Sequence, residues 1–158
     1  MRSSVETWEM TVGFCGHSRL YNDYDKIKYR CYEVVREQIA IGANCFLIGD
    51  YGDFDGIAAA VCLSLKKEYP HVEVCFVQPY YKPHIDDYTK QRYDKFDAII
   101  TPLLEGTPPR YRIVKANRYM VEQSDILIAY VRSSGGAAKT LEYAYRKGKK
   151  IFNLAEKI

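Results

Sequence analysis

Near its carboxyl end the chain reads Ile126-Leu127-Ile128-Ala129-Tyr130-Val131, then Arg132, then Ser133-Ser134-Gly135-Gly136-Ala137-Ala138-Lys139-Thr140-Leu141-Glu142. The apolar run predicts a buried strand and residues 139–148 predict a helix, so two glycines turn the strand into the helix. Such a turn points free N–H groups and the positive end of the helix dipole at one spot. That arrangement favours a bound phosphate group at Gly135 and Gly136, although an ordinary tight turn also uses such a pair. Glu142 adds a carboxylate beside it.

Apolar runs and helical patterns alternate along most of the chain. Strands are predicted at residues 11–16, 45–49, 72–77, 125–131 and 150–154, and helices at 24–41, 54–69, 112–124 and 139–148. Near-continuous apolar strands separated by helices predict an α/β fold, with a parallel sheet of about five strands and helices on both faces. A length of 158 residues fits a single domain spanning residues 1–158.

Three turns that contain glycine are predicted at the carboxyl edge of this sheet. They are Gly16-His17-Ser18, the stretch from Gly49 to Asp55, and Gly135-Gly136. In a parallel sheet the ligand binds beyond the carboxyl ends of the strands, near the point where the winding reverses. In the first of these turns, the residues expected to contact a ligand are Gly16, His17 and Ser18. In the second, they are Gly49, Asp50, Gly52 and Asp55. For His17 the alternative is a side chain that only caps its turn.

Residues 79–111 interrupt the alternation. This span holds five prolines and five tyrosines and a single short apolar piece, Phe96 to Thr101. A segment of this length and composition predicts a loop or lid over the cleft. The alternative is an irregular surface connection.

Several classes of site are disfavoured. The dinucleotide motif GxGxxG and the P-loop GxxxxGK[ST] are both missing, which argues against a NAD-dependent dehydrogenase and a P-loop NTPase. His17, His71 and His84 show no metal-ligand spacing, so no metal site and no cofactor are predicted.

Composition limits the partners and the compartment. The chain has 23 basic and 20 acidic residues, a net charge of +3, which disfavours nucleic acid and an anionic membrane as partners. Five cysteines without a CxxC pair favour a reduced, cytoplasmic protein. No signal peptide is expected in Met1–Met10, and no run is long enough to span a membrane. The 15 tyrosines offer flat stacking surfaces for a ligand or an interface.

Four motifs in order resemble those of the SLOG superfamily. They are Phe14-Cys15-Gly16-His17-Ser18, Gly49-Asp50-Tyr51-Gly52-Asp53-Phe54-Asp55-Gly56, Asn117-Arg118-Tyr119-Met120-Val121-Glu122-Gln123-Ser124-Asp125, and Gly135-Gly136 followed after three residues by Thr140-Leu141-Glu142. The resemblance covers residues 11–154 and implies a Rossmann-like fold. That superfamily includes the Lonely-guy phosphoribohydrolases, the DNA-processing protein of transformation, and domains that sense NAD-derived signals.

The resemblance also implies roles for particular residues. In the phosphoribohydrolases a PGGxGTxxE motif holds the 5′-phosphate and supplies a catalytic glutamate, which matches Glu142 here, while Arg118 matches the family arginine. Ser134, Gly135, Gly136 and Thr140 would hold the phosphate. The chain departs from the motif, because Ser134 replaces the proline, Ala138 replaces a glycine, and the threonine comes one place late.

Two hypotheses for function follow, and the sequence leaves open whether the protein is an enzyme. The first is a module that binds a nucleotide or an ADP-ribose-like ligand. The alternative is a nucleoside 5′-monophosphate phosphoribohydrolase, in which Glu142 stabilises positive charge on the ribose and Arg118 holds ligand oxyanions. A third idea, binding of single-stranded nucleic acid, lacks the expected basic groove. Self-association into a homo-oligomer is also expected.

Overall fold

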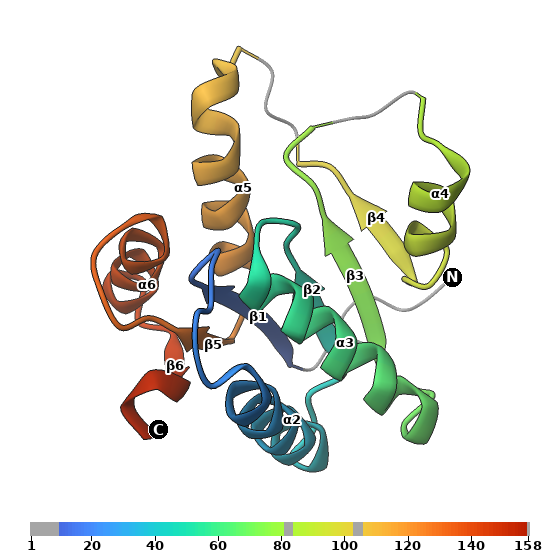
Figure 1. Cartoon of the computed structure of the whole chain (residues 1–158), viewed down its shortest axis with the longest axis vertical. Helices are drawn as coiled ribbons and strands as arrows, with labels where there is room; N and C mark the ends of the chain where they lie inside the picture. Colours follow the sequence, from blue (N-terminus) through green and yellow to red (C-terminus); the bar gives the residue numbers. More distant parts are fainter. Residues whose placement is uncertain (1–9, 81–83, 103–105, 158) are drawn as a thin grey trace.

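The expected parallel α/β sheet is confirmed, and it has six strands. The computed structural model describes residues 10–80, 84–102 and 106–157. The strands are β1 (Thr11–Gly16), β2 (Cys45–Ile48), β3 (Glu73–Val77), β4 (Ala98–Ile100), β5 (Ile126–Tyr130) and β6 (Lys150–Asn153). They are all parallel, in the order β4-β3-β2-β1-β5-β6 (Figure 1).

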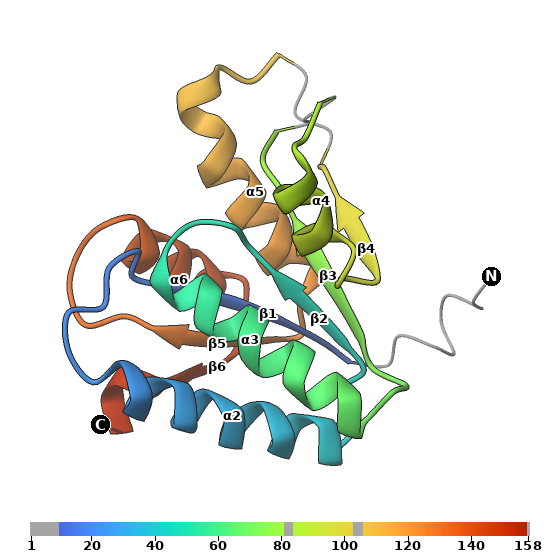
Figure 2. The same cartoon turned by 45° about the vertical axis from the view of Figure 1, so that its right-hand side comes forward.

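Helices cover both faces of the sheet. They are α2 (Tyr24–Ala40), α3 (Asp53–Glu68), α4 (Asp87–Tyr93), α5 (Pro109–Gln123) and α6 (Gly136–Arg146), followed by a 3₁₀ turn, Leu154–Lys157. Helices α2 and α3 lie side by side on one face, and α5 and α6 lie on the other (Figures 1 and 2). The fold is Rossmann-like.

Alternation along the strands sorts the core into two layers. In β2, Phe46 and Ile48 pack with the buried residues of α2 and α3, whereas Cys45 and Leu47 face α5. Successive strand side chains point to opposite faces, so a strand that is covered on both sides must be apolar throughout. All four residues of β2 are buried.

The winding of the chain reverses at β1. From β1 the chain moves outward through β2, β3 and β4, and then returns to β5 on the other side of β1. At that point Gly16 of β1 is in register with Tyr130 of β5. The carboxyl ends of these two strands therefore form the switch point at which α/β sheets bind ligands.

Residues 79–111 differ from the expected loop, because they contain α4 and the edge strand β4. Tyr93 at the end of α4 and Phe96 both pack on Phe76 of β3, with ring centroids 5.1 Å apart in each case. Asp97 accepts the N–H of Val74 at 2.7 Å, which starts the pairing of β4 with β3. A strand of three residues, two of them exposed, leaves little periodic signal. Residues 81–83 and 103–105 of this span lie outside the described residues.

The five cysteines are all buried, and none of them forms a disulfide. None of the helices in the described part of the chain is long and apolar enough to cross a membrane.

Candidate ligand-binding site

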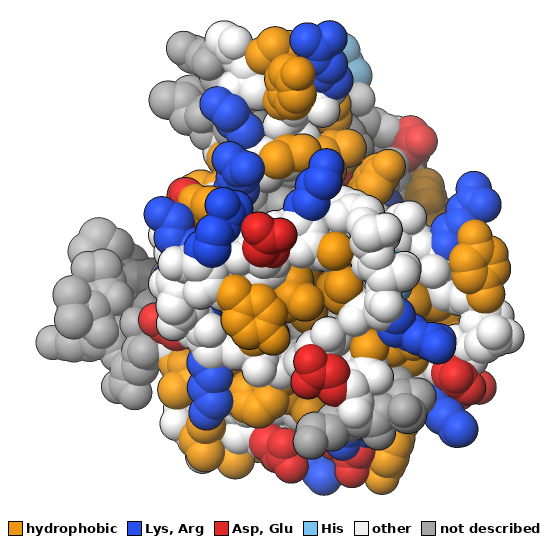
Figure 3. Space-filling model, turned by 90° about the vertical axis from the view of Figure 1, so that its left-hand side faces the viewer, with side chains coloured by type: hydrophobic (Ala, Val, Ile, Leu, Met, Phe, Trp, Pro, Cys, Tyr) orange, Lys and Arg blue, Asp and Glu red, His pale blue; other side chains and the backbone are white. Residues whose placement is uncertain are grey.

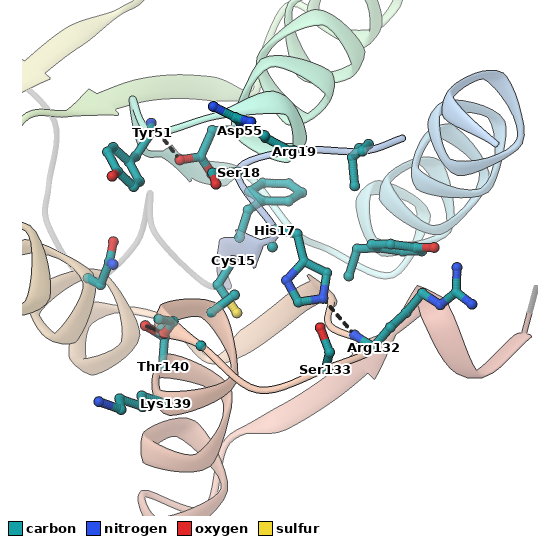
Figure 4. A pocket seen from close by; sticks show the side chains of 18 of the residues that line it. Cys15, His17, Ser18, Arg19, Tyr51, Asp55, Arg132, Ser133, Lys139 and Thr140 are labelled. Carbon is teal, nitrogen blue, oxygen red and sulfur yellow. Dashed lines mark hydrogen bonds between the residues drawn. The ribbon is translucent and has the colours of Figure 1, made fainter. Parts of the chain in front are cut away.

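A cavity of about 740 Å³ opens at the carboxyl ends of β1 and β5. Its walls are the loop after β1, the start of α3, one side of α5, and the β5–α6 turn with the first turns of α6 (Figure 4). A volume between about 300 and 1,000 Å³ is typical of small-molecule sites. The cavity therefore lies at the switch point of the sheet, where ligands bind in α/β folds.

The amino end of α6 is open to this cavity. Its first hydrogen bond within the described residues runs from the Lys139 N–H to the Gly135 carbonyl, 3.1 Å, so the N–H groups of Gly136 and the next two residues precede the ladder. Among the described residues, no side chain caps the helix. A Cβ placed on Gly135 or Gly136 would meet no described atom within 4 Å. The turn therefore offers free donors and empty space together.

The amino end of α3 is closed by the loop after β1. The N–H groups of Asp53 and Phe54 donate to the carbonyls of Ser18 (2.8 Å) and His17 (3.4 Å). In return the Asp53 carboxylate accepts the N–H of Leu20 at 2.9 Å. The first two bonds occupy the N–H groups of Asp53 and Phe54, and all three fix the loop after β1 against α3.

Three glycines near α3 lie so close to other residues that a side chain would not fit. A Cβ on Gly52 would overlap the backbone of Ser18, and a Cβ on Gly16 would overlap the ring of Phe54. A Cβ on Gly49 would lie 2.9 Å from a carboxylate oxygen of Asp55. These three glycines allow close packing of the loops that shape the cavity.

His17 joins the two strands at the switch point. The Nε2 atom of its ring accepts the backbone N–H of Arg132 at 2.8 Å. The backbone N–H of His17 donates to the Tyr130 carbonyl at 3.2 Å. Burial, and then the charge of Arg132, lower the pKa of His17. In the neutral ring the proton is therefore on Nδ1, because Nε2 is the acceptor. His17 presents a donor to the centre of the cavity, between Cys15 and Arg132 (Figure 4).

Asp55 is a cavity carboxyl that faces the α6 turn from the opposite wall. One oxygen accepts the Tyr51 N–H at 2.9 Å, and the other points into the cavity (Figure 4). Burial raises the pKa of Asp55 to about 7; the hydrogen bond from Tyr51 opposes the rise, and the charge of Asp50 adds to it. Asp55 therefore changes protonation near neutral pH. Such a group suits proton transfer or the binding of a ligand hydroxyl.

The thiol of Cys15 lines the same cavity. Burial, and secondarily the charge of Asp55, raise the pKa of Cys15 to about 12. A neutral thiol is a weak nucleophile, so Cys15 contributes packing surface.

Helix α5 supplies the outer wall of the cavity through Ile113, Val114, Asn117 and Arg118. The guanidinium of Arg118 lies over the ring of Tyr143 from α6, 5.0 Å from its centroid. The Tyr143 hydroxyl in turn donates to Glu122 of α5. These contacts join α5 to α6 and set the position of Arg118 at the cavity rim.

The structure brings most of the predicted site residues together. The nine that line the cavity are Gly16, His17, Ser18, Asp55, Arg118, Ser134, Gly135, Gly136 and Thr140. Thr140 is buried and donates its hydroxyl to the Gly136 carbonyl at 3.2 Å.

Four predicted residues do not line the cavity: Gly49, Asp50, Gly52 and Glu142. Asp50 forms an ion pair with Arg92 of α4 at 3.3 Å. Glu142 is exposed on α6. The helix starts at Gly136 and not at the expected residue 139, so Glu142 lies in its second turn.

Sequence reasoning missed several cavity residues, notably Arg19, Tyr51, Arg132 and Lys139. The two arginines flank predicted turns, so a search for basic residues next to strand ends would have found them. Tyr51 lies within the second of the four motifs, where only glycines and acids are expected to contact a ligand. Lys139 stands where the phosphoribohydrolase motif has its threonine, so the resemblance gives no reason to expect it at the site.

Basic residues gather on the α5–α6 side of the molecule. Residues 109–123 carry four basic residues and one glutamate, and residues 132–150 carry six basic residues and one glutamate. These two segments have a net charge of +8 in a chain of +3. Figure 3 shows Lys and Arg side chains crowded on the upper part of this face. The balanced overall composition therefore conceals a strongly polarised surface.

Known family models give no match to the chain, and neither do curated protein sequences. Solved structures do match. DNA processing protein A from Helicobacter pylori, whose single-stranded DNA binding mode has been described, has a TM-score of 0.67 and 17% identity; the match covers 96% of this chain and 68% of that one. The molybdenum cofactor carrier protein from Chlamydomonas reinhardtii has a TM-score of 0.55 and 16% identity, with 90% and 74% covered. At these identities the likeness shows a shared Rossmann-like fold.

Among the described residues, no group of three or more His, Cys, Asp or Glu side chains is placed to hold a metal ion. The charged side chains among the described residues of the cavity are four cations and a single carboxyl, Asp55. This set suits an anionic organic ligand better than a metal.

Proposed function

We propose that the protein binds a nucleotide or nucleotide-derived ligand, with a phosphate group held at the Gly135–Gly136 turn. The observation that carries the proposal is the open amino end of α6 at the switch point. Free N–H groups and the helix dipole stabilise a phosphate there, and Lys139 and Arg118 lie at the same cavity. Asp55, on the opposite wall, is placed for a ribose hydroxyl, and the apolar side chains of α5 for a base.

The test is a binding titration with inorganic phosphate, ribose 5-phosphate, the four nucleoside 5′-monophosphates and ADP-ribose. Calorimetry should show binding of at least one phosphorylated ligand and none of the matching nucleoside without phosphate. Equal affinity for a nucleoside and its 5′-phosphate would exclude the proposed phosphate position.

The proposal is compatible with membership of the SLOG superfamily, which rests on the four motifs. Within that superfamily the alternative function is phosphoribohydrolase activity, with Glu142 and Arg118 as catalytic residues. The exposed position of Glu142 outside the cavity makes this the second choice. Release of free base from a nucleoside 5′-monophosphate, measured by chromatography, would reverse the ranking.

A further candidate is an extended single-stranded nucleic acid on the α5–α6 face. The observation that favours it is the +8 net charge of residues 109–123 and 132–150, and DNA processing protein A is described as binding single-stranded DNA. Such binding weakens steeply with salt, because each phosphate contact releases counterions. Fluorescence anisotropy with an oligonucleotide at low and high salt measures this mode of binding. Free nucleotides should compete with the oligonucleotide only if it binds in the cavity.

A cytoplasmic setting and homo-oligomerisation stay predictions. Five buried cysteines that form no disulfide support a reducing compartment. Light scattering of the purified protein measures the oligomeric state directly.

A further inference from the structure

Asp55 is the single carboxyl among the described residues that line the cavity. It lies in the first turn of α3 and is only partly buried, so a ligand in the cavity can reach it. An ionised carboxylate accepts hydrogen bonds and donates none, and it repels a phosphate. Its position on the wall opposite the α6 turn therefore indicates a part of the ligand that is neutral and carries hydrogen-bond donors.

Protein contacts hold the Asp55 carboxyl in one orientation. Its Oδ2 atom accepts the backbone N–H of Tyr51 at 2.9 Å, and a Cβ on Gly49 would lie only 2.9 Å from the same oxygen. The other oxygen, Oδ1, points into the cavity, and no described residue donates a hydrogen bond to it (Figure 4). An acceptor that is already fixed loses little entropy when a ligand binds to it.

The sheet sets the separation between this carboxyl and the phosphate turn. Asp55 follows β2 and Gly135 follows β5, and β1 lies between these two strands. Adjacent strands are about 4.8 Å apart, so the turns that follow β2 and β5 begin about 10 Å apart. Across such a distance, a ribose 5-phosphate whose phosphate lies at Gly135 can bring its 2′- and 3′-hydroxyls within reach of Asp55.

We propose that the cavity selects ribonucleotides over deoxyribonucleotides, because the Asp55 carboxylate accepts hydrogen bonds from both the 2′- and the 3′-hydroxyl of the ribose. This selectivity depends on the phosphate position proposed above at α6. A carboxylate has about four acceptor sites, so it can take two hydroxyls and keep the Tyr51 N–H. A deoxyribose supplies one donor fewer and leaves a charged oxygen unmatched, which is how a polar site rejects an analogue that lacks a hydroxyl.

The same contact couples ligand binding to a proton. Burial raises the pKa of Asp55 to about 7, and the charge of Asp50 adds to the rise. Hydroxyl donors favour the charged carboxylate, so a bound ribose lowers this pKa again and releases a proton. The selectivity for ribose should therefore increase as the pH rises through about 7.

Other groups around the cavity also carry charge or titrate. From β1, the loop after β1, the loop before α3, α5 and α6 come Cys15, His17, Arg19, Tyr51, Arg118 and Lys139. These groups, and the second ionisation of the phosphate itself, act alike on a ribonucleotide and on its deoxy counterpart. The ratio of the two affinities therefore isolates the contribution of Asp55.

The experiment measures affinities by calorimetry at pH 5.5 and pH 8 for the four ribonucleoside 5′-monophosphates and for their 2′-deoxy and 3′-deoxy counterparts. At pH 8 the ribonucleotide with the preferred base should bind at least about tenfold more tightly than either deoxy form, since each lacks one charge-assisted hydrogen bond. At pH 5.5 the ratio should fall to about threefold or less, because a neutral carboxyl forms weaker hydrogen bonds.

Two variants assign the selectivity to one carboxyl. D55N keeps an acceptor for the Tyr51 N–H and is neutral at every pH, so its ratio should equal that of the wild type at pH 5.5 and stay constant up to pH 8. D50N is the matched control, because it removes a carboxylate of the same loop that does not line the cavity. The charge of Asp50 raises the pKa of Asp55, so D50N should keep the full ratio at pH 8 and reach it at a lower pH.

The outcomes separate this selectivity from the proposed function. Equal affinity of the wild type for ribo- and deoxyribonucleotides at pH 8 would overturn the selectivity and leave the proposed phosphate position intact. A ratio that D55N retains in full at pH 8 would place the hydroxyls elsewhere and overturn it as well. If no phosphorylated ligand binds at either pH, the proposed function itself fails.

Discussion

Helices α3 and α6 begin after a glycine with nearly the same backbone. Gly52 has φ 106° and ψ −171°, and Gly135 has φ 135° and ψ −165°. Both lie at the carboxyl edge of the sheet, and no side chain in the described part of the chain caps either helix. The surroundings differ. Gly52 is in contact with Ser18, whereas Gly135 has empty space where its side chain would be.

The difference shows what a glycine motif specifies. A positive φ requires glycine in both turns, so the sequence signal is equally strong. At α3 the loop after β1 takes up the free donors of the helix. At α6 the donors stay free beside the cavity. One glycine turn is structural and the other is the candidate site, and substitutions at each should separate these roles.

The largest effect is expected for Gly52→Ala. Backbone strain of about 1–3 kcal/mol would add to displacement of the Ser18 loop, for a total of about 4 kcal/mol lost from the free energy of unfolding. Gly135→Ala carries similar strain without the clash, so it should cost less than half as much. Urea unfolding of the two variants measures the difference. Equal losses would show that the loop after β1 moves aside freely.

Gly136→Val tests the open helix end directly. Its side chain would project where the phosphate approaches, and affinity for the phosphorylated ligand should fall at least about tenfold, which corresponds to 1.4 kcal/mol. Stability should change little, because no described atom lies within 4 Å of the new Cβ. Gly56→Val in α3 is the matched control, also with open space, and should leave affinity unchanged. Undiminished affinity in Gly136→Val would remove the phosphate from this turn.

Asp53→Ala tests the closed helix end. The variant loses the acceptor for the Leu20 N–H and an acid in the first turn of α3, and should lower the free energy of unfolding by about 1–2 kcal/mol. Asp53→Asn retains an acceptor and should recover part of that loss. If both variants unfold like the wild type, the carboxylate does not fix the loop.

Asp55→Asn should have an effect that depends on pH. The folded-state pKa of about 7 lies above the ordinary value of 3.8, so folding favours the protonated form. That contribution is complete below pH 3.8 and is lost as pH rises to about 7. Asn resembles the protonated acid at every pH, so its stability relative to wild type should increase between pH 4.5 and 8. A difference that stays constant over this range would place the titration elsewhere.

The smallest effect is expected for Glu142→Gln. The side chain is exposed and does not line the cavity, so ligand affinity should change less than about twofold, as for surface substitutions in general. A loss of hydrolytic rate by orders of magnitude would instead support the phosphoribohydrolase hypothesis.

The sheet was predictable because five strands have strong local patterns. Continuous apolar runs such as 126–131 mark strands buried on both faces, and the helices between them imply parallel pairing. The sixth strand, β4, was missed because it has three residues and pairs on one side only. Its position depends on contacts of Phe96 and Asp97 with β3, which leave no periodic signal.

The site residues in backbone turns were predicted from the sequence. The site residues with long side chains on neighbouring positions were missed. His17 and Gly135 follow strand ends, so the topology alone brings them together. Arg19 and Arg132 line the cavity with long side chains, whose direction the sequence does not indicate. Glu142 was tied to the site by spacing in sequence, but the start of α6 at Gly136 places it on the outer surface.

The sequence by itself determined the parallel sheet, its carboxyl edge and the glycine turns found there, because apolar periodicity and positive φ are local properties. Tertiary structure alone decided which turn stays open. Whether helix donors remain free depends on which loop packs against them, and that loop comes from a distant part of the chain. Ser18 and Asp53 close α3, whereas the described residues leave the amino end of α6 open to the cavity.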